Sequence, residues 1–303
     1  MTNSLNLFAD ILKKGENKGQ LNTKKKKIKF FLRTILTLNY SLRLNRFILN
    51  HKYLKSKVYS YPVLISKIHR PYLKKNFKTS EKLNTIINTY KTIDNIFEND
   101  FLEKLYLNNR ITLAEILGKD NTKFFISLEL YPVFDKEGEI NLKLLDENNV
   151  ALSTITFSFT ENKNCDSLNL FIGGIQGAPK DIDKEYIKKA TKNLHGIFPK
   201  KLLIEVLYIL EDHLKISIKK FSVSNESHIY KSQRYLRKRI IHSSYDEFLQ
   251  SLDSKKLSSG IWELPEKLSK KSLEDIPSSK RSQHLKKMNI LEQIEKSIGN
   301  LNN

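Results

Sequence analysis

The stretch Asn169–Asn225, NLFIGGIQGAPKDIDKEYIKKATKNLHGIFPKKLLIEVLYILEDHLKISIKKFSVSN, decides the fold that we expect for this chain. It opens with an apolar strand that runs into paired glycines, and a basic helix and a His-Gly-x-x-Pro turn follow. Pro199 fits the first position of a second helix, where its missing N–H costs nothing, and leucines recur on one face of that helix. Ile216–Val223 then returns as a strand. The stretch therefore predicts a strand-helix-strand crossover.

The turn before the second helix is a candidate anion site. Gly196 precedes Pro199, and Lys200 and Lys201 occupy the first helical turn, where two positive charges oppose the helix dipole. A negatively charged ligand would explain them, because free N–H groups at a helix N-terminus favour an anion. Two solvated surface lysines are the simpler explanation, and the sequence leaves both open.

Upstream of this stretch, the hydrophobic period changes from helical to alternating near Gly118. Residues 28–118 carry apolar side chains at helical spacing, broken at Pro62 and Pro71, and predict three or four helices. Alternating runs then predict antiparallel strands, with Glu137 and Gly138 in the turn between the first two. The expected fold class is α+β, a helical N-terminal region plus a mixed-sheet domain.

Three segments are expected along the chain. Residues 1–27 are a mobile basic N-terminus, residues 28–118 a basic helical region, and residues 119–303 an α+β domain with a basic C-terminal helical tail. A last amphipathic helix is expected near His284–Ile298.

The 303 residues carry a formal net charge of +20, the main departure from an ordinary globular composition. This charge favours anionic partners, although a Lys/Asn/Ile-rich genome would also supply many lysines. The single Cys165 excludes an internal disulfide and a cysteine-based zinc site, and no metal is expected. No signal peptide and no run of about 18 apolar residues is recognisable, so we expect a cytoplasmic protein, peripheral at the inner membrane if it is attached at all.

Basic side chains crowd the helical region and the C-terminal tail. Almost no acids oppose Lys29, Arg33, Lys67 or Arg70, and Tyr235 lies within the basic run Arg234–Arg239. A basic amphipathic region of this kind binds an anionic membrane surface or nucleic acid. No nucleic-acid motif accompanies it, so the expected partner is a membrane surface or a phosphorylated ligand.

Eight short motifs follow one another along the chain: HRPYL (69–73), TFSF (156–159), IGGIQG (172–177), ATKNLHGIFPKKLL (190–203), VSNESHIY (223–230), YDEF (245–248), WELP (262–265) and IPSSKR (276–281). Together, and in this order, they resemble the VirK/YbjX family of bacterial proteins over roughly residues 30–295. One departure is Leu249, where an aromatic residue commonly follows the YDEF-like segment.

This resemblance implies a biological context rather than a reaction. Members of the family are linked to the Gram-negative envelope, to virulence, to resistance against cationic antimicrobial peptides and to lipid A acylation, and some are membrane-associated. No mechanism comes with the family, so the chemistry has to be argued from residues.

The central stretch also resembles the acyl-CoA-binding core of GNAT-type N-acyltransferases. In that fold a bulged strand offers N–H groups to a thioester carbonyl, and the next helix N-terminus holds a pyrophosphate. The resemblance implies CoA or an acyl-CoA as cofactor, with an acyl-carrier protein as another donor. The cofactor-binding residues would be Gly173, Gly174, Ile175, Gly196, Lys200, Lys201 and Asn225. The catalytic residues would be Tyr230 as the acid and His195, Glu226 or His228 as the base.

The same residues have structural explanations. The usual pyrophosphate loop of GNAT proteins is replaced here by His195–Lys200. Gly173 and Gly174 fit a β-bulge or close packing as well as they fit the approach of a ligand. Trp262 is expected in the core.

Three other matches are discounted. His242–Glu247 spells the His-x4-Glu of lysophospholipid acyltransferases, but 7 histidines and 33 acids among 303 residues give about one such match by chance. Asp181–Asp183 more simply begins a helix, and Glu211–His213 ends one on the surface. Two functions therefore remain: an acyltransferase at the cytoplasmic face of the inner membrane, and a non-catalytic membrane-surface or chaperone-like protein that helps envelope components to mature.

Overall fold

The computed structural model of the protein describes residues 2–14, 23–162, 167–235, 244–269 and 272–302. Cys165, His242 and Arg237–Arg239 lie outside the described residues. The elements are, in chain order, α1 (Thr2–Lys14), α2 (Lys24–Leu36), α3 (Leu38–Asn50), α4 (Leu54–Ser60), α5 (Val63–Ser66), η1 (Lys67–His69), α6 (Thr79–Ile96), α7 (Asn99–Asn108), β1 (Arg110–Leu117), η2 (Lys119–Asn121), β2 (Lys123–Leu130), β3 (Ile140–Asp146), β4 (Ala151–Glu161), β5 (Leu168–Gly177), α8 (Lys184–Asn193), α9 (Pro199–His213), β6 (Lys219–Val223), η3 (Ile229–Lys231), α10 (Tyr245–Gln250), β7 (Lys255–Lys256), β8 (Ile261–Glu263), α11 (Ser278–Gly299) and η4 (Asn300–Asn302).

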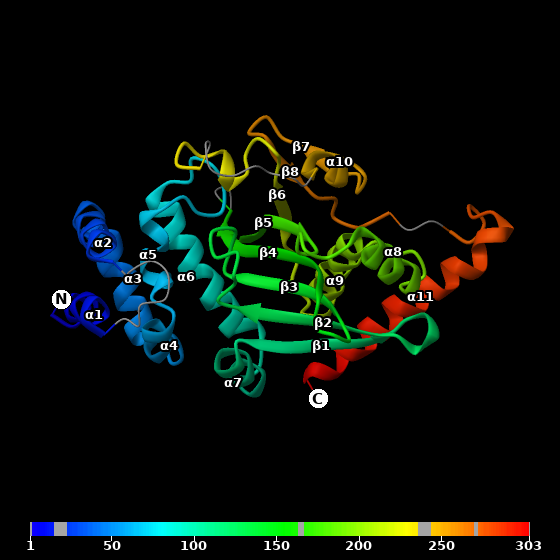
Figure 1. Ribbon diagram of the computed structural model, residues 1–303, viewed down its shortest axis with the longest axis horizontal. Coiled ribbons are helices and arrows are strands. Elements are labelled where there is room, and N and C mark those ends of the chain that lie inside the picture. The colour runs from blue at the N-terminus through cyan, green and yellow to red at the C-terminus, as the bar shows by residue number, and fades with distance from the viewer. Residues whose placement is uncertain (1, 15–22, 163–166, 236–243, 270–271, 303) are drawn as a thin grey trace.

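An eight-stranded mixed sheet forms the centre of the molecule (Figure 1). Its strand order is β1-β2-β3-β4-β5-β6-β8-β7, and β1 to β5 are an antiparallel meander. The chain leaves β5, passes through α8 and α9, and returns as β6 parallel to β5. The sequence-based prediction of an α+β fold with a strand-helix-strand crossover is therefore confirmed.

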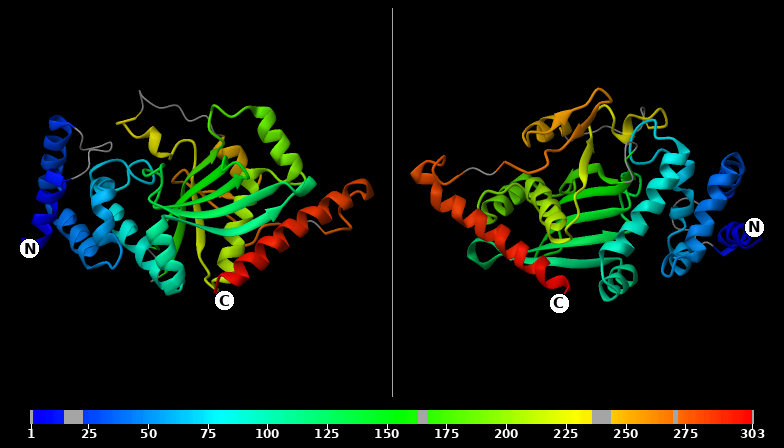
Figure 2. Two further views of the ribbon diagram at one scale, coloured as in Figure 1. Left: turned by 60° about the horizontal axis from the view of Figure 1, so that its bottom comes forward. Right: turned by 180° about the vertical axis from the view of Figure 1, so that it is seen from behind.

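The register of the meander separates an apolar face from a polar one. Leu128 pairs with Leu142, Leu142 with Ile155, and Ile155 with Ile175, so apolar side chains line up across neighbouring strands. Because side chains alternate along a strand, polar residues such as Thr154 and Thr156 face the other way. The helices α9 and α11 lie against one face of the sheet (Figure 2). Burial of the apolar row against these helices supplies the core.

The helical N-terminal region stands beside the sheet, and α6 runs along the ends of the strands (Figure 1). The chain breaks between helices at Pro62 and Pro71, as the sequence predicts. Part of the segment that was expected to be mobile is the helix α1, which buries Leu7, Phe8 and Ile11 in the core and packs on α3.

The boundary expected near residue 118 is wrong, because the sheet begins at Arg110 with β1. In RITLAEIL the apolar residues Ile111, Leu113 and Ile116 follow neither period throughout, because the pairing with β2 skips Leu113 as the extra residue of a β-bulge and so shifts the alternation. The helix after Pro199 is confirmed, since α9 begins at that residue and buries one face. Trp262 is buried as expected, on the short strand β8, which the sequence did not reveal.

Candidate functional site

Two fully buried glutamates lie in the connection between β2 and β3. Glu137 and Glu139 are each 0 % exposed, although both stand in a segment that reads as an ordinary turn. Gly138 between them passes so close to β4 that an added Cβ would lie 2.5 Å from the carbonyl oxygen of Phe157. Burying a carboxylate is expensive unless it is paired and hydrogen-bonded, so the partners of these two residues decide what they do.

Glu139 is satisfied from three sides. Its carboxylate accepts hydrogen bonds from Lys67 Nζ at 2.7 Å, the Tyr72 hydroxyl at 2.7 Å and the Tyr90 hydroxyl at 2.9 Å. Lys67 is itself 0 % exposed, and burial lowers its pKa while Glu139 acts to raise it. Next to this pair, Arg70 Nη2 donates to Asp135 at 2.6 Å. The expectation that Lys67 and Arg70 are unopposed by acids is therefore wrong, because the opposing acids come from the β2–β3 connection.

Glu137 belongs to a second buried cluster. Gln176 Nε2 donates to both carboxylate oxygens, at 3.2 and 3.1 Å, and His228 Nε2 lies 3.6 Å from one of them. The same His228 nitrogen lies 3.3 Å from the Tyr245 hydroxyl. Because His228 Nδ1 accepts from the Tyr230 N–H, the neutral ring carries its proton on Nε2, between Glu137 and Tyr245. Burial lowers the pKa of His228 to about 4.

The paired glycines make room for Glu137. The pairing of β4 with β5 skips Gly173, which is therefore the extra residue of a β-bulge. An added Cβ would lie 2.0 Å from the Glu137 carbonyl oxygen at Gly173, and 1.9 Å from its carboxylate at Gly174. Both structural explanations of the pair, a bulge and close packing, hold in the fold.

Beyond the bulge, β5 and β6 separate. They pair only over Asn169–Ile172 and Lys219–Ser222, which leaves the rest of β5 without a strand partner on that side. The Ile175 N–H, the donor expected to meet a thioester, donates instead to the Tyr245 hydroxyl at 3.1 Å. Tyr245 is 2 % exposed and comes from α10, so it fills the position beside Ile175. The YDEF motif was the one sequence signal that pointed to this residue.

The remaining residues predicted after β6 lie around Tyr245 or on the surface. Asn225 Oδ1 accepts from the Tyr245 N–H at 3.1 Å, and Asp246 accepts from both the Asn225 N–H and Trp262 Nε1. The ring of Tyr230 lies 5.0 Å from that of His228. Glu226 is exposed, and its carboxylate faces Gly260 rather than the buried cluster.

The predicted residues between α8 and α9 form a separate group. His195 and Gly196 make a turn with positive φ, and Gln283 of α11 donates to the His195 carbonyl oxygen at 2.9 Å. Lys201 lines a surface cavity of about 470 Å³, which Lys287 also lines. Lys200 points instead toward Gly177 of β5, and burial lowers its pKa. His195 thus faces α11, whereas His228 faces the bulge.

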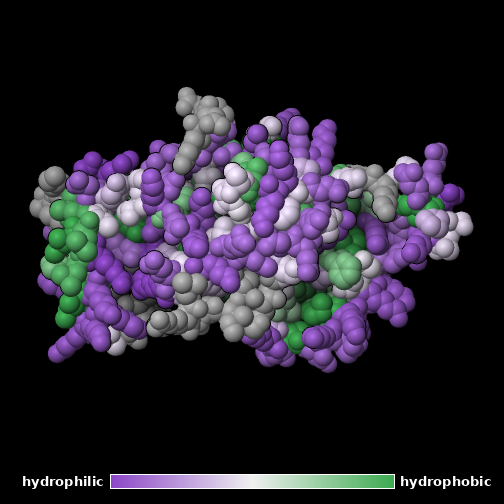
Figure 3. Space-filling view, turned by 90° about the horizontal axis from the view of Figure 1, so that it is seen from above, coloured by the Kyte–Doolittle hydropathy of each residue, from purple (hydrophilic) through white to green (hydrophobic). Residues whose placement is uncertain are grey.

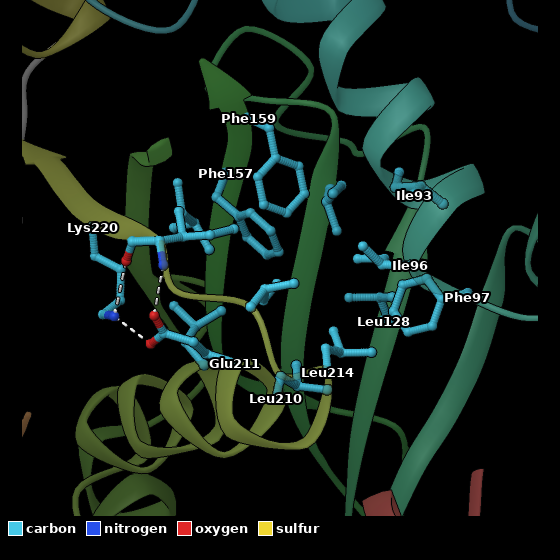
Figure 4. A pocket seen from close by; sticks show the side chains of 15 residues that line it. Ile93, Ile96, Phe97, Leu128, Phe157, Phe159, Leu210, Glu211, Leu214 and Lys220 are labelled. Carbon is cyan, nitrogen blue, oxygen red and sulfur yellow. Dashed lines mark hydrogen bonds and ion pairs between the residues drawn. The ribbon is translucent and has the colours of Figure 1, made fainter. Parts of the chain in front are cut away.

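An apolar pocket between α6, α9 and the sheet could be considered for an acyl chain (Figure 4). Figure 4 shows Phe157 and Phe159 on one wall and Leu210 on another, with the ion pair of Lys220 and Glu211 at the edge. Its volume is about 50 Å³, which has room for a few water molecules but not for an acyl chain.

A larger and strongly basic pocket lies between α2, η1 and the segment after η3. Its volume is about 380 Å³, within the range of small-molecule sites. Arg70 in its wall is only 4 % exposed, and among the described residues its Nε and Nη1 have no hydrogen-bond partner. We call this the basic pocket, and its lining residues are Lys26, Lys29, Phe30, Arg33, Ser66, His69, Arg70, Lys136, Arg234 and Tyr235.

The positive charges around this pocket repel one another. Burial, together with the charges of Arg33, Lys82 and Arg70, lowers the pKa of His69 to about 4. Burial and the charge of Arg234 bring the pKa of Lys82 to about 8, and the same two causes lower the pKa of Arg33. The arrangement holds positive charge in excess at a partly desolvated site.

The outer surface of α2 is apolar. Ile28, Phe31, Leu32, Ile35 and Leu36 are between 52 and 83 % exposed, and their spacing places them on one face of the helix. Figure 3 shows this side as a hydrophobic patch at the end of the molecule that α1 to α3 occupy. At 100° per residue, the residues of α2 that line the basic pocket, such as Lys29 and Arg33, lie on a different face.

The fold and these sites define a mixed α+β protein with buried acids beneath a basic pocket. The sequence matches the family described as "Protein of unknown function (DUF535)" over residues 19–300. It is 29 % identical to the "Uncharacterized protein YbjX" of Escherichia coli, over 90 % of this chain and 82 % of that protein. It is also 27 % identical to an "Uncharacterized protein" of Haemophilus influenzae, over 75 % of this chain and 73 % of that one. The chain belongs to the DUF535 family, as its resemblance to VirK/YbjX proteins indicated.

Several of the motifs that carried this resemblance meet in one place. HRPYL holds Arg70 and Tyr72, IGGIQG holds Gln176, VSNESHIY holds His228, YDEF holds Tyr245 and WELP holds Trp262. The HRPYL and VSNESHIY segments are joined by the bridge of Lys74 with His228 and by the hydrogen bond from the Lys75 N–H to the Ser227 carbonyl. Sequence reasoning missed Glu137 and Glu139, because nothing local distinguishes a buried glutamate from one in a solvated turn.

Proposed function

We propose that this protein docks on an anionic membrane surface through the exposed apolar face of α2. The observation that carries the proposal is the apolar row Ile28, Phe31, Leu32, Ile35 and Leu36 on a helix that also holds the lysine run Lys24–Lys27. Helices of this composition lie in the interfacial plane with their apolar face among the acyl chains and their basic residues at the phosphates.

The balance of forces favours a bilayer over water for this face. Full burial of a Leu, Ile or Phe side chain stabilises by about 1.5–3 kcal/mol, and a side chain that is half exposed has roughly half of that left to gain. Lys or Arg near an anionic leaflet adds about 1 kcal/mol each. The net charge of +20 acts in the same direction.

Attachment of this kind needs no membrane-spanning segment. Within the part of the chain that the structure describes, no helix is both long enough and apolar enough to cross a bilayer. A peripheral position at the inner membrane is therefore part of the proposal. The envelope context implied by the VirK/YbjX resemblance fits it.

Vesicle co-sedimentation tests the proposal. The variant Phe31→Ser, Leu32→Ser, Leu36→Ser should lose at least tenfold in affinity for vesicles rich in phosphatidylglycerol, because it removes three inserted side chains. The matched control Leu107→Ser, Val133→Ser, Phe198→Ser replaces three exposed apolar residues outside α2, and it should bind like the wild type. Equal binding by all three proteins, or equal affinity for neutral phosphatidylcholine vesicles, would refute anionic-membrane docking through α2. Self-association lost in the α2 variant alone would assign the face to a second copy of the chain instead.

Acyl transfer is a second candidate, supported by one observation. The β-bulge at Gly173 fits the bulged strand that the resemblance to N-acyltransferases implies for holding an acyl thioester. Binding there would require the Tyr245 hydroxyl to leave the Ile175 N–H. We would titrate CoA, acetyl-CoA and a long-chain acyl-CoA against thermal stability, where a hundredfold excess over Kd adds about 2.7 kcal/mol. A saturable shift that is lost in Lys200→Ala, Lys201→Ala would support acyl-CoA binding, and no shift with any CoA species would remove CoA from this candidate.

A further inference from the structure

Positive charge is concentrated in the basic pocket. Seven basic side chains line it, and an eighth, Lys82, is near enough to lower the pKa of His69. The carboxylate of Asp135 is bonded to Arg70 Nη2 and compensates one of these charges. Like charges held together at a partly buried site destabilise the fold unless a ligand offsets them.

Arg70 shows where that ligand would bind. Its side chain is 4 % exposed, and the hydrogen bond from Nη2 to Asp135 fixes the plane of the guanidinium group. The Nε and Nη1 atoms, which have no partner among the described residues, lie on different edges of the planar guanidinium group, and each can donate a hydrogen bond to a phosphate oxygen. A buried guanidinium with two unmet donors is costly by itself. Water could meet the donors, but only an anion would also offset the nearby charges of Arg33 and Arg234.

The shape of the pocket indicates a ligand larger than a bare ion. Its volume of about 380 Å³ exceeds what one phosphate fills, and the rings of Phe30 and Tyr235 form part of its wall. Aromatic walls suit an uncharged portion of a ligand, with the charged group held by the arginines.

We propose that the basic pocket binds the dianionic phosphate group of a phosphomonoester, with Arg70, Arg33 and Arg234 as its principal ligands. The phosphate could be that of a soluble metabolite or that of a lipid headgroup, since α2 forms one wall of the pocket and also carries the exposed apolar face. The site does not depend on membrane docking, because a soluble phosphate can reach it without a bilayer. It is also distinct from the helix N-terminus at Lys200 and Lys201.

Isothermal titration calorimetry of the full chain tests the site. The probes are inorganic phosphate, pyrophosphate, dihexanoyl phosphatidic acid and dihexanoyl phosphatidylcholine, each at the same ionic strength set with NaCl. Arg33→Gln, Arg234→Gln should weaken the dianions at least tenfold. The matched control Lys201→Gln, Lys287→Gln removes the same charge from the surface cavity beside α9 and should stay within twofold of the wild type.

The outcomes show whether the pocket binds a phosphate and, if it does, which kind of phosphate. Tighter binding of dihexanoyl phosphatidic acid than of phosphate assigns a lipid headgroup, and equal binding assigns a soluble phosphomonoester. Saturable binding that both double variants weaken equally would show unspecific attraction and overturn the proposal, as would no binding by any dianion. Arg70→Lys keeps the charge next to Asp135 but removes the Nε and Nη1 donors. It should therefore weaken the binding of pyrophosphate while leaving the fold intact. An unchanged Kd would remove Arg70 from the site.

Discussion

The acid cluster around Glu139 lies next to the basic pocket around Arg70. The charges of the first are paired with one another, whereas positive charge is in excess in the second. Glu139 is buried with a lysine and two tyrosine hydroxyls on its oxygens. Arg70, three residues after Lys67, is buried with one acid, and two of its donors have no partner among the described residues. The first arrangement is complete within the chain and therefore serves the fold. The second would be completed by the anion that we propose to bind there.

The largest expected effect comes from disrupting the fully paired cluster around Glu139. Lys67→Met leaves the fully buried Glu139 without its cation, and the loss of one partner of a buried ion pair costs about 3–5 kcal/mol. Urea denaturation would measure it. The double variant Lys67→Met, Glu139→Leu should recover a large part of that loss, because it removes both charges. A loss under about 1 kcal/mol in the single variant would contradict our view of this cluster.

The two histidines should make stability fall in acid. His69 and His228 have a pKa of about 4 in the fold against 6.5 when unfolded, so the unfolded chain binds more protons between these values. Stability is therefore lost as the pH falls from 6.5 toward 4, by up to about 3 kcal/mol per histidine. Urea midpoints at pH 7 and pH 4.5 would show it, and His228→Gln should remove one part of the pH dependence.

A bound dianion sharpens this prediction. It would raise the pKa of His69, which lies in the basic pocket between the charges of Arg33, Lys82 and Arg70. It would leave that of His228 unchanged, because His228 faces Glu137 and Tyr245 instead. Saturating pyrophosphate should therefore reduce the loss of stability in acid that His69 causes, and it should leave the loss that His228 causes unchanged. The same acid sensitivity with and without pyrophosphate would contradict the placement of the anion beside His69.

A smaller effect is expected from filling the space beside Glu137. Gly174→Ala places a Cβ 1.9 Å from the Glu137 carboxylate, and overpacking of this kind costs about 1–3 kcal/mol. Gly177→Ala on the same strand is the control, since its nearest contact would be an ordinary 3.8 Å to Lys200. Chemical denaturation of both variants measures the difference. If the two variants were equally stable, the glycine pair would not be needed for the buried glutamate.

The smallest effect on stability is expected from changes in the basic pocket. Arg33→Gln, Arg234→Gln removes repulsion from the basic pocket, so the fold should be unchanged or more stable by up to about 1 kcal/mol. The same variant is expected to lose phosphate binding. A gain in stability with a loss of binding is typical of a functional site. A clear loss of stability in this variant would show that these arginines serve the fold.

Sequence patterns predicted the parts of this protein that depend on local periodicity. The alternation of apolar and polar residues predicted β2 to β5, and Pro199 predicted the start of α9, because both features depend on a few neighbouring residues. The strand β1 was missed because the β-bulge at Leu113 interrupts its alternation of apolar and polar residues. Of the predicted site residues, His228 lies beside the glycine bulge, whereas His195 lies against α11.

The sequence by itself determined the order of elements, the excess of positive charge and the family to which the chain belongs. Only the tertiary structure decided which charges are paired, because Glu139 meets Lys67 across 72 residues and Asp135 meets Arg70 across 65. Such pairings follow from how the β2–β3 connection packs on the helical region, and no local pattern encodes that. The physical reason is that the worth of a charge depends on its burial and its partners, and both are properties of the folded chain.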